Sequence, residues 1–183
     1  MHFRHIRRTQ RFKVKMLQKR KRVQMSKKPG ASRRSERELA FQFLYGLDFA
    51  PARSEAELRT RFAQSASTAD KTSAGFAWEL ALGVWNHAQA VDALIARFAH
   101  NWRLDRMGRV ELTLLRLAVY ELRYRPDIPP RVAINEALEL CKQFGEASAR
   151  SFINGILDAA AKALDQDAQA AGTTPAVRAD HEN

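Results

Sequence analysis

Apolar residues recur at the helical spacing i, i+3, i+4 along almost the whole chain after residue 35. No segment alternates with the period of two that marks a strand, and no internal repeat or heptad array is visible. The sequence therefore predicts an all-α fold of six to seven helices. We expect a divide near residues 100–106, which gives two packed helical subdomains over about 32–100 and 101–164 of one domain, 32–164.

The stretch FINGILD, residues 152–158, tests this interpretation, because Asn-Gly between apolar pairs is a strong hairpin signal. A hairpin would scatter the apolar residues of this region over both faces, whereas a helix gathers them in one stripe. We therefore predict a helix through Asn154 and Gly155, at about 1 kcal/mol of propensity cost for Gly relative to Ala. That cost suggests close approach by another backbone or a ligand. The stripe comprises Ile153, Ile156, Leu157, Ala160 and Leu164.

Local start and stop signals give the expected helix boundaries. A capping box at Ser35 and Glu38 begins a helix over 36–49, and a second box at Ser54 and Glu57 opens a short one. Residues 74–99 form one long helix or two joined by a bend, with a weak point at Gly83. The next helix covers 107–124.

The last two helices follow a proline-rich connection. Pro130 suits the first turn of a helix over 131–144, which ends at Gly145 as a C′ residue with positive φ. Ser148 then caps the final helix, which is expected to end near residue 164.

Positive charge is concentrated at the start of the chain. Residues 1–34 hold 14 of the 31 Lys and Arg residues and no Asp or Glu, which leaves the remainder with a net charge of −3. Such a segment is attracted to phosphate, because each cation that neutralises a phosphate releases condensed counterions. We expect a disordered basic arm over 1–31 and a disordered tail over 165–183.

Other interpretations of the arm stay open: an organelle transit peptide, a solvated tail, or upstream sequence translated from a mis-assigned start. The arm has few Ser residues and no secretory apolar run, and Met25 can begin a shorter chain. We favour the mis-assigned start or a dispensable tail for residues 1–24. The functional candidates retained here are Lys27, Lys28, Arg33 and Arg34.

Catalytic and metal-binding patterns are missing from the sequence. The five His residues have no metal-ligand spacing, and neither a glycine-rich phosphate loop nor GxSxG occurs. Cys141 lies in an apolar helical pattern, which favours a buried reduced thiol in a cytoplasmic protein over a nucleophile or metal ligand. No window of the sequence reaches 18 uncharged apolar residues, so none could span a membrane. We expect no enzymatic activity, no cofactor and no metal.

Binding to single-stranded nucleic acid is better supported. Arg33, Arg34 and Arg37 lie at the start of the first expected helix, where the dipole and free N–H groups add to their attraction for phosphate. Tyr45 lies two turns further on and can stack on a base. The competing interpretations are a solvated basic helix start and core packing of Tyr45, and these residues alone do not decide between them.

Several stretches together resemble the NusB family of bacterial transcription antitermination factors. They are RRSERELAFQFLYGLDF, VELTLLRLAVYEL, DIPPRVAINEALELCKQFG and FINGILD, in one order and at one spacing. The resemblance covers about residues 33–162, is strongest over 102–158 and is weak over 51–75. It implies an all-α fold of two packed helical subdomains. It also implies binding of boxA RNA in ribosomal RNA transcripts together with NusE, a small-subunit ribosomal protein, in a complex with other Nus factors on RNA polymerase.

Residue by residue, the resemblance implies RNA contacts at the arginine-rich helix start and at Tyr45. It places further RNA-facing or partner-facing positions at Glu111, Ser148 and Phe152. The NusE contact is expected around the proline-rich turn and on the last helix, at Asp127, Arg131, Asn154 and Gly155.

Two alternatives accompany this interpretation. A purely structural helical adaptor without specific RNA binding is one, and a homodimer is an option for the free protein. A related domain also begins certain ribosomal RNA cytosine methyltransferases, but we expect no such enzyme because no α/β domain follows residue 165.

Overall fold

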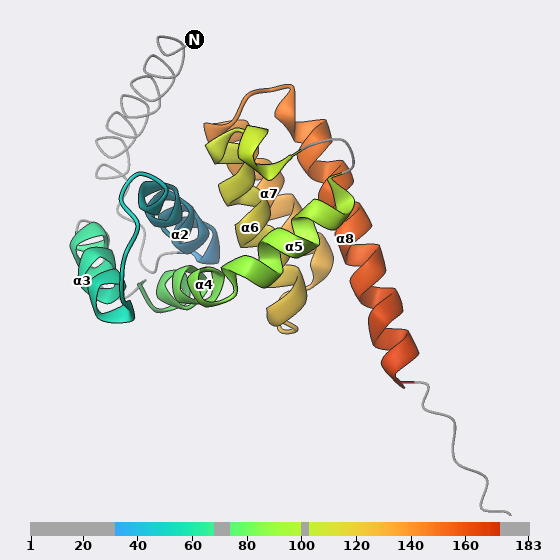
Figure 1. The fold of residues 1–183 in the computed structure, drawn as a ribbon, viewed down its shortest axis with the longest axis horizontal. Helices are drawn as coiled ribbons and strands as arrows, with labels where there is room; N and C mark the ends of the chain where they lie inside the picture. Colours follow the sequence, from blue (N-terminus) through green and yellow to red (C-terminus); the bar gives the residue numbers. More distant parts are fainter. Residues whose placement is uncertain (1–31, 68–73, 100–102, 173–183) are drawn as a thin grey trace, which may run out of the picture.

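The computed structural model describes residues 32–67, 74–99 and 103–172, and this part of the chain is all-α, as predicted (Figure 1). The predicted arm over 1–31 and residues 173–183 of the predicted tail lie outside the described residues. None of the helices in the described ranges is long and apolar enough to cross a membrane. The helices are α2 (Arg33–Leu47), α3 (Glu55–Ala66), α4 (Ala74–Asn86), α5 (Ala88–Phe98), α6 (Arg109–Tyr124), α7 (Pro130–Phe144) and α8 (Ala149–Gly172), with a 3-10 turn η2 (Leu104–Arg106) before α6.

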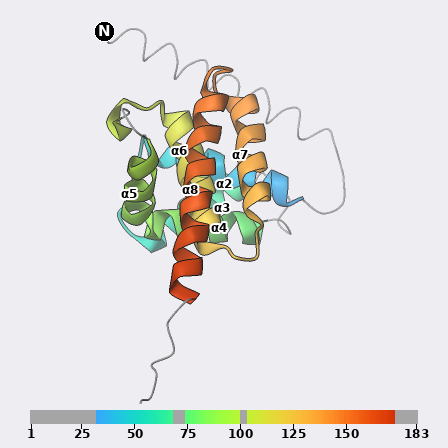
Figure 2. The ribbon, with the colours of Figure 1, turned by 90° about the vertical axis from the view of Figure 1, so that its right-hand side faces the viewer.

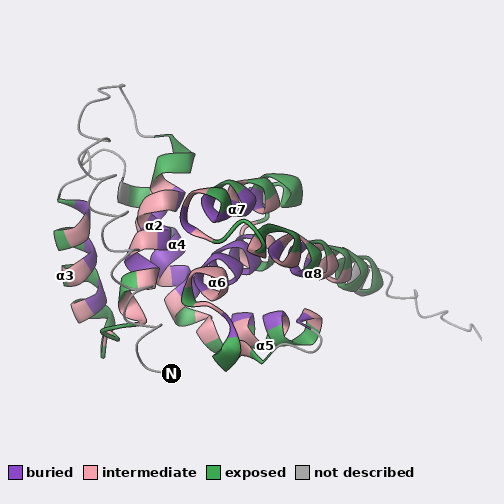
Figure 3. Ribbon diagram, turned by 90° about the horizontal axis from the view of Figure 1, so that it is seen from above, coloured by how far each residue is buried: buried purple, intermediate pink, exposed green. Residues whose placement is uncertain are grey.

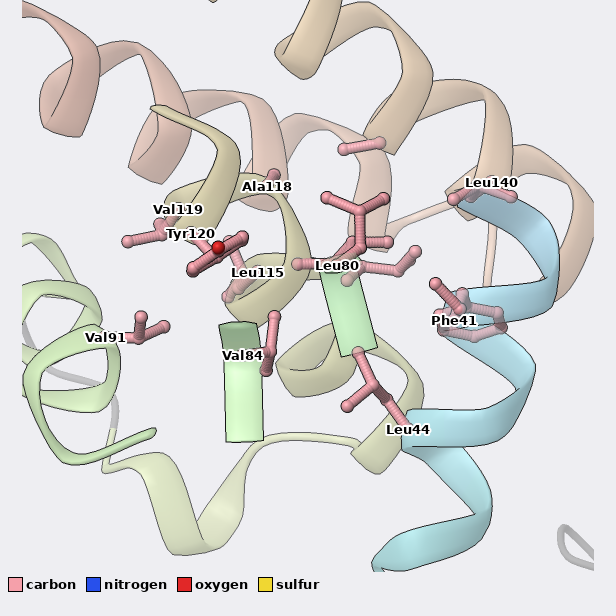
Figure 4. Close-up of a cluster of buried hydrophobic side chains, with 14 of the residues drawn as sticks. Phe41, Leu44, Leu80, Val84, Val91, Leu115, Ala118, Val119, Tyr120 and Leu140 are labelled. Atoms are coloured by element: carbon pink, nitrogen blue, oxygen red, sulfur yellow. The ribbon is translucent and has the colours of Figure 1, made fainter. Parts of the chain in front are cut away.

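Helix α6 is the centre of the packing, because α2, α4, α5, α7 and α8 all contact it. Figure 1 shows α2, α3 and α4 gathered on one side, with α7 and α8 on the other. Helix α5, on the N-terminal side of the expected divide, packs on α6 and α8. Side chains of α2, α4, α5, α6 and α7 meet in one apolar core, in which Phe41, Leu80 and Leu115 are fully buried (Figure 4). Figure 3 shows the buried positions turned inward between the helices.

The capping box predicted at Ser35 is misplaced by one turn. Helix α2 begins at Arg33, and its N-cap is Ser32, whose Oγ accepts from the Ser35 N–H at 3.4 Å. Glu36, in the first turn, instead accepts from the N–H groups of Phe76 and Ala77 at 2.9 and 3.1 Å. Those groups begin α4 and have no partner within their own helix, so a carboxylate of α2 stabilises the start of α4.

The second capping box is confirmed, because Ser54 Oγ accepts from the Glu57 N–H at 3.2 Å. The segment 74–99 is two helices, and they meet at His87 rather than at the predicted weak point, Gly83. Gly83 lies inside α4 against the Tyr120 ring, which a Cβ at this position would overlap. The glycine is therefore explained by close packing of α4 on α6.

Two details at the helix ends differ from the predictions. Gly145 follows α7 with a φ of −88°, not a positive one, and a Cβ there would lie 2.9 Å from the Cys141 carbonyl oxygen. Its role is to leave space for that carbonyl. Helix α8 continues to Gly172, so its predicted end near 164 is too early, and the predicted tail begins within a helix. Residues 165–170 are all exposed, and Figures 1 and 2 show these turns extending beyond the body.

The helical interpretation of FINGILD is confirmed. Residues 152–158 lie within α8, and the predicted stripe residues Ile153, Ile156, Leu157 and Ala160 are buried. Cys141 is buried as expected, and burial raises the pKa of its thiol.

Candidate nucleic-acid interface

Helices α2 and α6 run antiparallel, which divides the predicted RNA-binding residues between two ends. Near the start of α2, Arg37 pairs with Glu121 in the last turn of α6. Near its end, the Arg109 guanidinium at the start of α6 donates to the Asp48 carbonyl oxygen at 3.1 Å. Arg33 and Tyr45 are therefore about 18 Å apart along α2. We call the end of α2 near Arg33 the turn end (Arg33, Arg34, Arg125, Asp127, Arg131). We call the end near Tyr45 the aromatic end (Tyr45, Phe49, Arg109, Glu111).

At the turn end, both predicted surface arginines are exposed but already paired. Arg34 makes a two-pronged contact with Glu136 of α7, with Nε at 3.0 and 3.1 Å and Nη2 at 2.6 Å from the carboxylate oxygens. The hydrogen bond to Glu136 raises the pKa of Arg34. Arg33 lies 3.6 Å from Asp127, with its guanidinium over the Phe76 ring at 5.0 Å. A phosphate that binds here competes with a carboxylate for each guanidinium.

Arg37 is not the third surface cation that the sequence predicts. Its side chain is 4% exposed, and its Nε lies 2.8 Å from Oε1 of Glu121, which is 2% exposed. Burial raises the pKa of Glu121, and the neighbouring Arg37 offsets part of that rise. The pair joins α2 to α6 inside the protein, so Arg37 positions the helix and does not reach a ligand.

The predicted partner residues of the proline-rich turn lie beside these arginines. Arg125 donates to both Asp127 oxygens, at 2.9 and 3.1 Å, and to Glu79 at 2.9 Å. The hydrogen bond from Arg125 holds the pKa of Asp127 below its ordinary value. Arg131 is exposed, one residue before Val132, which is 41% exposed. The structure thus brings together residues that the sequence assigned separately to RNA and to a protein partner.

At the aromatic end, Tyr45 is half-buried, which fits core packing in part and leaves base stacking a prediction. Its ring centroid lies 6.2 Å from that of Phe41 in the core and 5.2 Å from that of Phe49 outside it. Burial raises the pKa of the Tyr45 hydroxyl. The ring is anchored from one side and still partly exposed, as a stacking surface must be.

Glu111 belongs to the same end, because its charge acts on the Tyr45 hydroxyl. Glu111, in the first turn of α6, lies over Gly108 so closely that a Cβ there would overlap its carboxylate. Helix α6 packs against α7. Phe152 is half-buried against the core, and Ser148 is exposed immediately before α8.

Asn154 and Gly155 lie further along α8. Asn154 donates to Asp158 at 2.8 Å, one turn away on the same helix. Gly155 is exposed, and a Cβ added to it would meet nothing within 4 Å. No described part of the chain approaches this glycine closely, so its lack of a side chain is not explained by the internal packing.

Two residues of the aromatic end were missed by sequence reasoning. Phe49 is 46% exposed just after α2, and the Arg109 guanidinium lies over its ring at 4.5 Å. A signal for Phe49 was present, because it falls between the end of the apolar stripe of α2 and Pro51. Nothing local marked Arg109, since its ring contact is made with a residue sixty positions earlier.

Among the described residues, no group of three His, Cys, Asp or Glu side chains is arranged to hold a metal ion. A cavity of about 190 Å³ lies between α5, α6 and α8, lined by Leu94, Tyr124 and Leu164 among others. None of the predicted RNA-binding residues lines it.

A sequence profile of the NusB family matches residues 34–162 of this chain. The transcription antitermination protein NusB of Desulfovibrio desulfuricans is 60% identical over 149 residues, which cover 77% of this chain and 91% of that protein. The solved structure of T. maritima NusB has a TM-score of 0.66 at 34% identity, over 73% of this chain and 92% of that one. A chain from a complex of the antitermination factors NusB and NusE with double-stranded RNA has a TM-score of 0.63 at 28% identity, over 72% and 96%.

Proposed function

The chain belongs to the NusB family, and from that membership we propose that it is a non-catalytic, cytoplasmic RNA-binding antitermination factor. It binds boxA-type single-stranded RNA of ribosomal RNA transcripts together with NusE. The resulting complex joins other Nus factors on RNA polymerase.

The arrangement along α2 is the observation that carries the RNA-binding part of this proposal. One straight helix presents two exposed arginines at its start and a half-exposed aromatic ring about 18 Å away. Phosphates need cations and unpaired bases need ring faces, and that distance suits a strand rather than a single nucleotide. Arg33 and Arg34 bind phosphate by releasing Asp127 and Glu136, while Tyr45 stacks on a base. Glu111, Ser148 and Phe152 complete the surface at the aromatic end.

We propose that the protein partner binds at the turn end and on α8. The complex of NusB and NusE with RNA, solved for a related chain, supports NusE as that partner. Asp127 and Arg131 flank exposed prolines and the exposed Val132, a mixture of polar and apolar surface that suits a protein contact. Asn154 and Gly155 form the second part of the contact.

A fluorescence anisotropy titration tests the proposal. The probe is a fluorescein-labelled boxA RNA, with a scrambled strand of the same composition as control, each titrated with and without NusE. We expect tighter binding of the boxA strand, and a further gain when NusE is present. Equal affinity for both strands would refute sequence-specific recognition.

Gly155→Leu tests the contact on α8 separately from folding. Because a Cβ meets nothing there and Leu has a higher helix propensity than Gly, the variant should unfold at an equal or higher temperature. We expect it to weaken binding of NusE or of RNA by occupying the space into which the ligand fits. Normal binding of both ligands would show that nothing approaches Gly155 closely.

A helical adaptor without specific RNA binding is the second candidate, favoured by the carboxylate partners of Arg33 and Arg34. It predicts that Arg34→Ala and deletion of residues 1–31 both leave every binding constant unchanged. A loss of RNA affinity in either variant, with NusE affinity retained, excludes it.

A further inference from the structure

Phe49 is an aromatic side chain placed in an exposed layer of rings. It follows the end of α2 and remains 46% exposed, although it packs on other side chains from two directions. The Tyr45 ring meets it edge-on, with centroids 5.2 Å apart and planes at 62°. The Arg109 guanidinium lies over the Phe49 ring at 4.5 Å from its centroid. Tyr45, Phe49 and Arg109 thus form a layered cluster that begins in the core and ends at the surface.

Arg109 is held in place without losing its charge to a carboxylate. Its Nη1 donates to the neutral Asp48 carbonyl oxygen at 3.1 Å, while the Asp48 carboxylate lies 3.5 Å from Arg116. Within the described ranges, no carboxylate oxygen is recorded within 4.0 Å of the Arg109 guanidinium, in contrast to Arg33 and Arg34. Arg109 is exposed, and the Phe49 ring lies against one face of its guanidinium.

We propose that this cluster is a stacking platform for an unpaired RNA base, with Arg109 as its outer layer. The base lies on the other face of the guanidinium, and the charge of Arg109 neutralises the adjoining phosphate. Bases of single-stranded RNA stack on aromatic rings and on Arg guanidinium planes alike, so a ring covered by an arginine presents a suitable surface. The inference rests on the proposed function and adds Phe49 and Arg109 to the RNA-binding surface.

RNA fits this platform better than a protein segment does. The outer layer is a planar cation with no carboxylate oxygen within 4.0 Å among the described residues, a complement to a negatively charged strand with flat bases. The platform also continues directly from Tyr45, so a strand that stacks on Tyr45 reaches Arg109 without crossing the core.

The experiment compares three substitutions in anisotropy titrations with labelled boxA RNA in the presence of NusE. Arg109→Ala should weaken binding by about 5- to 150-fold, the range measured when a base-stacking residue is removed. Phe49→Leu keeps an apolar side chain but removes the ring, and should weaken binding in the same direction. Arg106→Ala removes the same charge just before α6 without a ring contact, and should cost less than Arg109→Ala.

An abasic scan of the RNA locates the stacked base. Removing that base should weaken binding to the unsubstituted protein but not to the Arg109→Ala variant, because the contact is already absent there. Equal losses in Arg106→Ala and Arg109→Ala would reduce the effect to charge and overturn the stacking proposal. A loss of NusE affinity measured without RNA would instead make the platform a protein contact. Thermal unfolding of each variant checks that it folds.

Failure of this inference is distinguishable from failure of the proposed function. If Tyr45→Ala weakens RNA binding while Arg109→Ala and Phe49→Leu do not, the platform is wrong and the RNA-binding function stands. If the unsubstituted protein does not bind RNA even with NusE, both are wrong.

Discussion

The arginines at the two ends of α2 have different kinds of partner. At the turn end, Arg33, Arg34 and Arg37 each lie within 4.0 Å of a carboxylate, and Arg37 is buried with its partner. At the aromatic end, Arg109 lies on a ring and a carbonyl group instead. A basic sequence motif is therefore no measure of the charge available to a ligand. Under the proposed function, the turn end would exchange a carboxylate for a phosphate, whereas Arg109 at the aromatic end would bind an anion without such an exchange.

The sharpest test of the turn end is to break its buried pair. Arg37→Ala leaves Glu121 uncompensated inside the protein, which should lower the free energy of unfolding by about 3–5 kcal/mol. Urea denaturation measures this loss, with Arg34→Ala as the matched surface control, which should lose much less stability because its ion pair is exposed to solvent. Replacing both members, as Arg37→Met with Glu121→Leu, should recover most of the stability. A loss for Arg37→Ala no larger than that for Arg34→Ala would show that the buried pair does not join the helices.

The aromatic end should respond through RNA binding rather than through stability. Tyr45→Ala removes a stacking ring, so RNA affinity should fall by about 1–3 kcal/mol. Tyr45→Phe keeps the ring and serves as the control, with binding close to that of the unsubstituted protein. Anisotropy titration measures both. If the two substitutions weaken binding equally, the hydroxyl and not the ring is the contact.

The proposed exchange of carboxylate for phosphate at the turn end can be tested by substituting either Arg34 or Glu136. Arg34→Ala should lower the slope of log affinity against log salt concentration by about 0.7, as expected for one lost phosphate contact to a single strand. Glu136→Gln removes the charged partner of Arg34 and should tighten RNA binding slightly, because a surface ion pair is weak. Titrations at three or more salt concentrations measure both effects. Weaker binding by Glu136→Gln would contradict the exchange.

The smallest expected effect is on the pH dependence of folding stability. The contributions of Asp127 and Asp48 to that dependence have opposite signs. The pKa of Asp127 is lowered by Arg125, so its contribution to stability is present above its unfolded value of about 3.9 and is lost on acidification. Burial raises the pKa of Asp48, so the folded state takes up a proton first and is favoured as pH falls through that higher value. Melting temperatures between about pH 3 and 6 should rise less steeply with pH in Asp127→Asn than in the unsubstituted protein, and more steeply in Asp48→Asn. The same change of slope in both variants would contradict this account.

The spacing of apolar residues was sufficient to predict most of the helices, because the residues of a buried stripe lie close together in the sequence. Ile153, Ile156 and Leu157 were placed correctly from their spacing alone, against a strong hairpin signal. The capping box at Ser54 was also correct, since its bonds lie within four residues. The weak point predicted at Gly83 was wrong because the deciding partner is distant: the glycine faces Tyr120 of another helix. The capping box predicted at Ser35 was wrong for a local reason, because Ser32 is the N-cap.

Arg37 shows what a closer reading of the site could have found. It lies on the apolar stripe with Ala40, Phe41 and Leu44, as Glu121 lies on the stripe of α6. A lone charge at a buried position needs a partner of opposite sign, and these two residues satisfy one another. The Phe49–Arg109 contact had no such signal, because an exposed ring and an exposed cation each fit the surface without explanation.

The pairing of Arg37 with Glu121 also sets an order of events during protein synthesis. The two residues are 84 positions apart. At ordinary rates of chain elongation, about 4–17 s separate their synthesis. Through that interval α2 can pack on α4 but has neither the counter-charge of Arg37 nor its contact with α6. The surface that α2 organises can therefore be completed only late, when most of the chain has been made, and an unfinished chain does not display it.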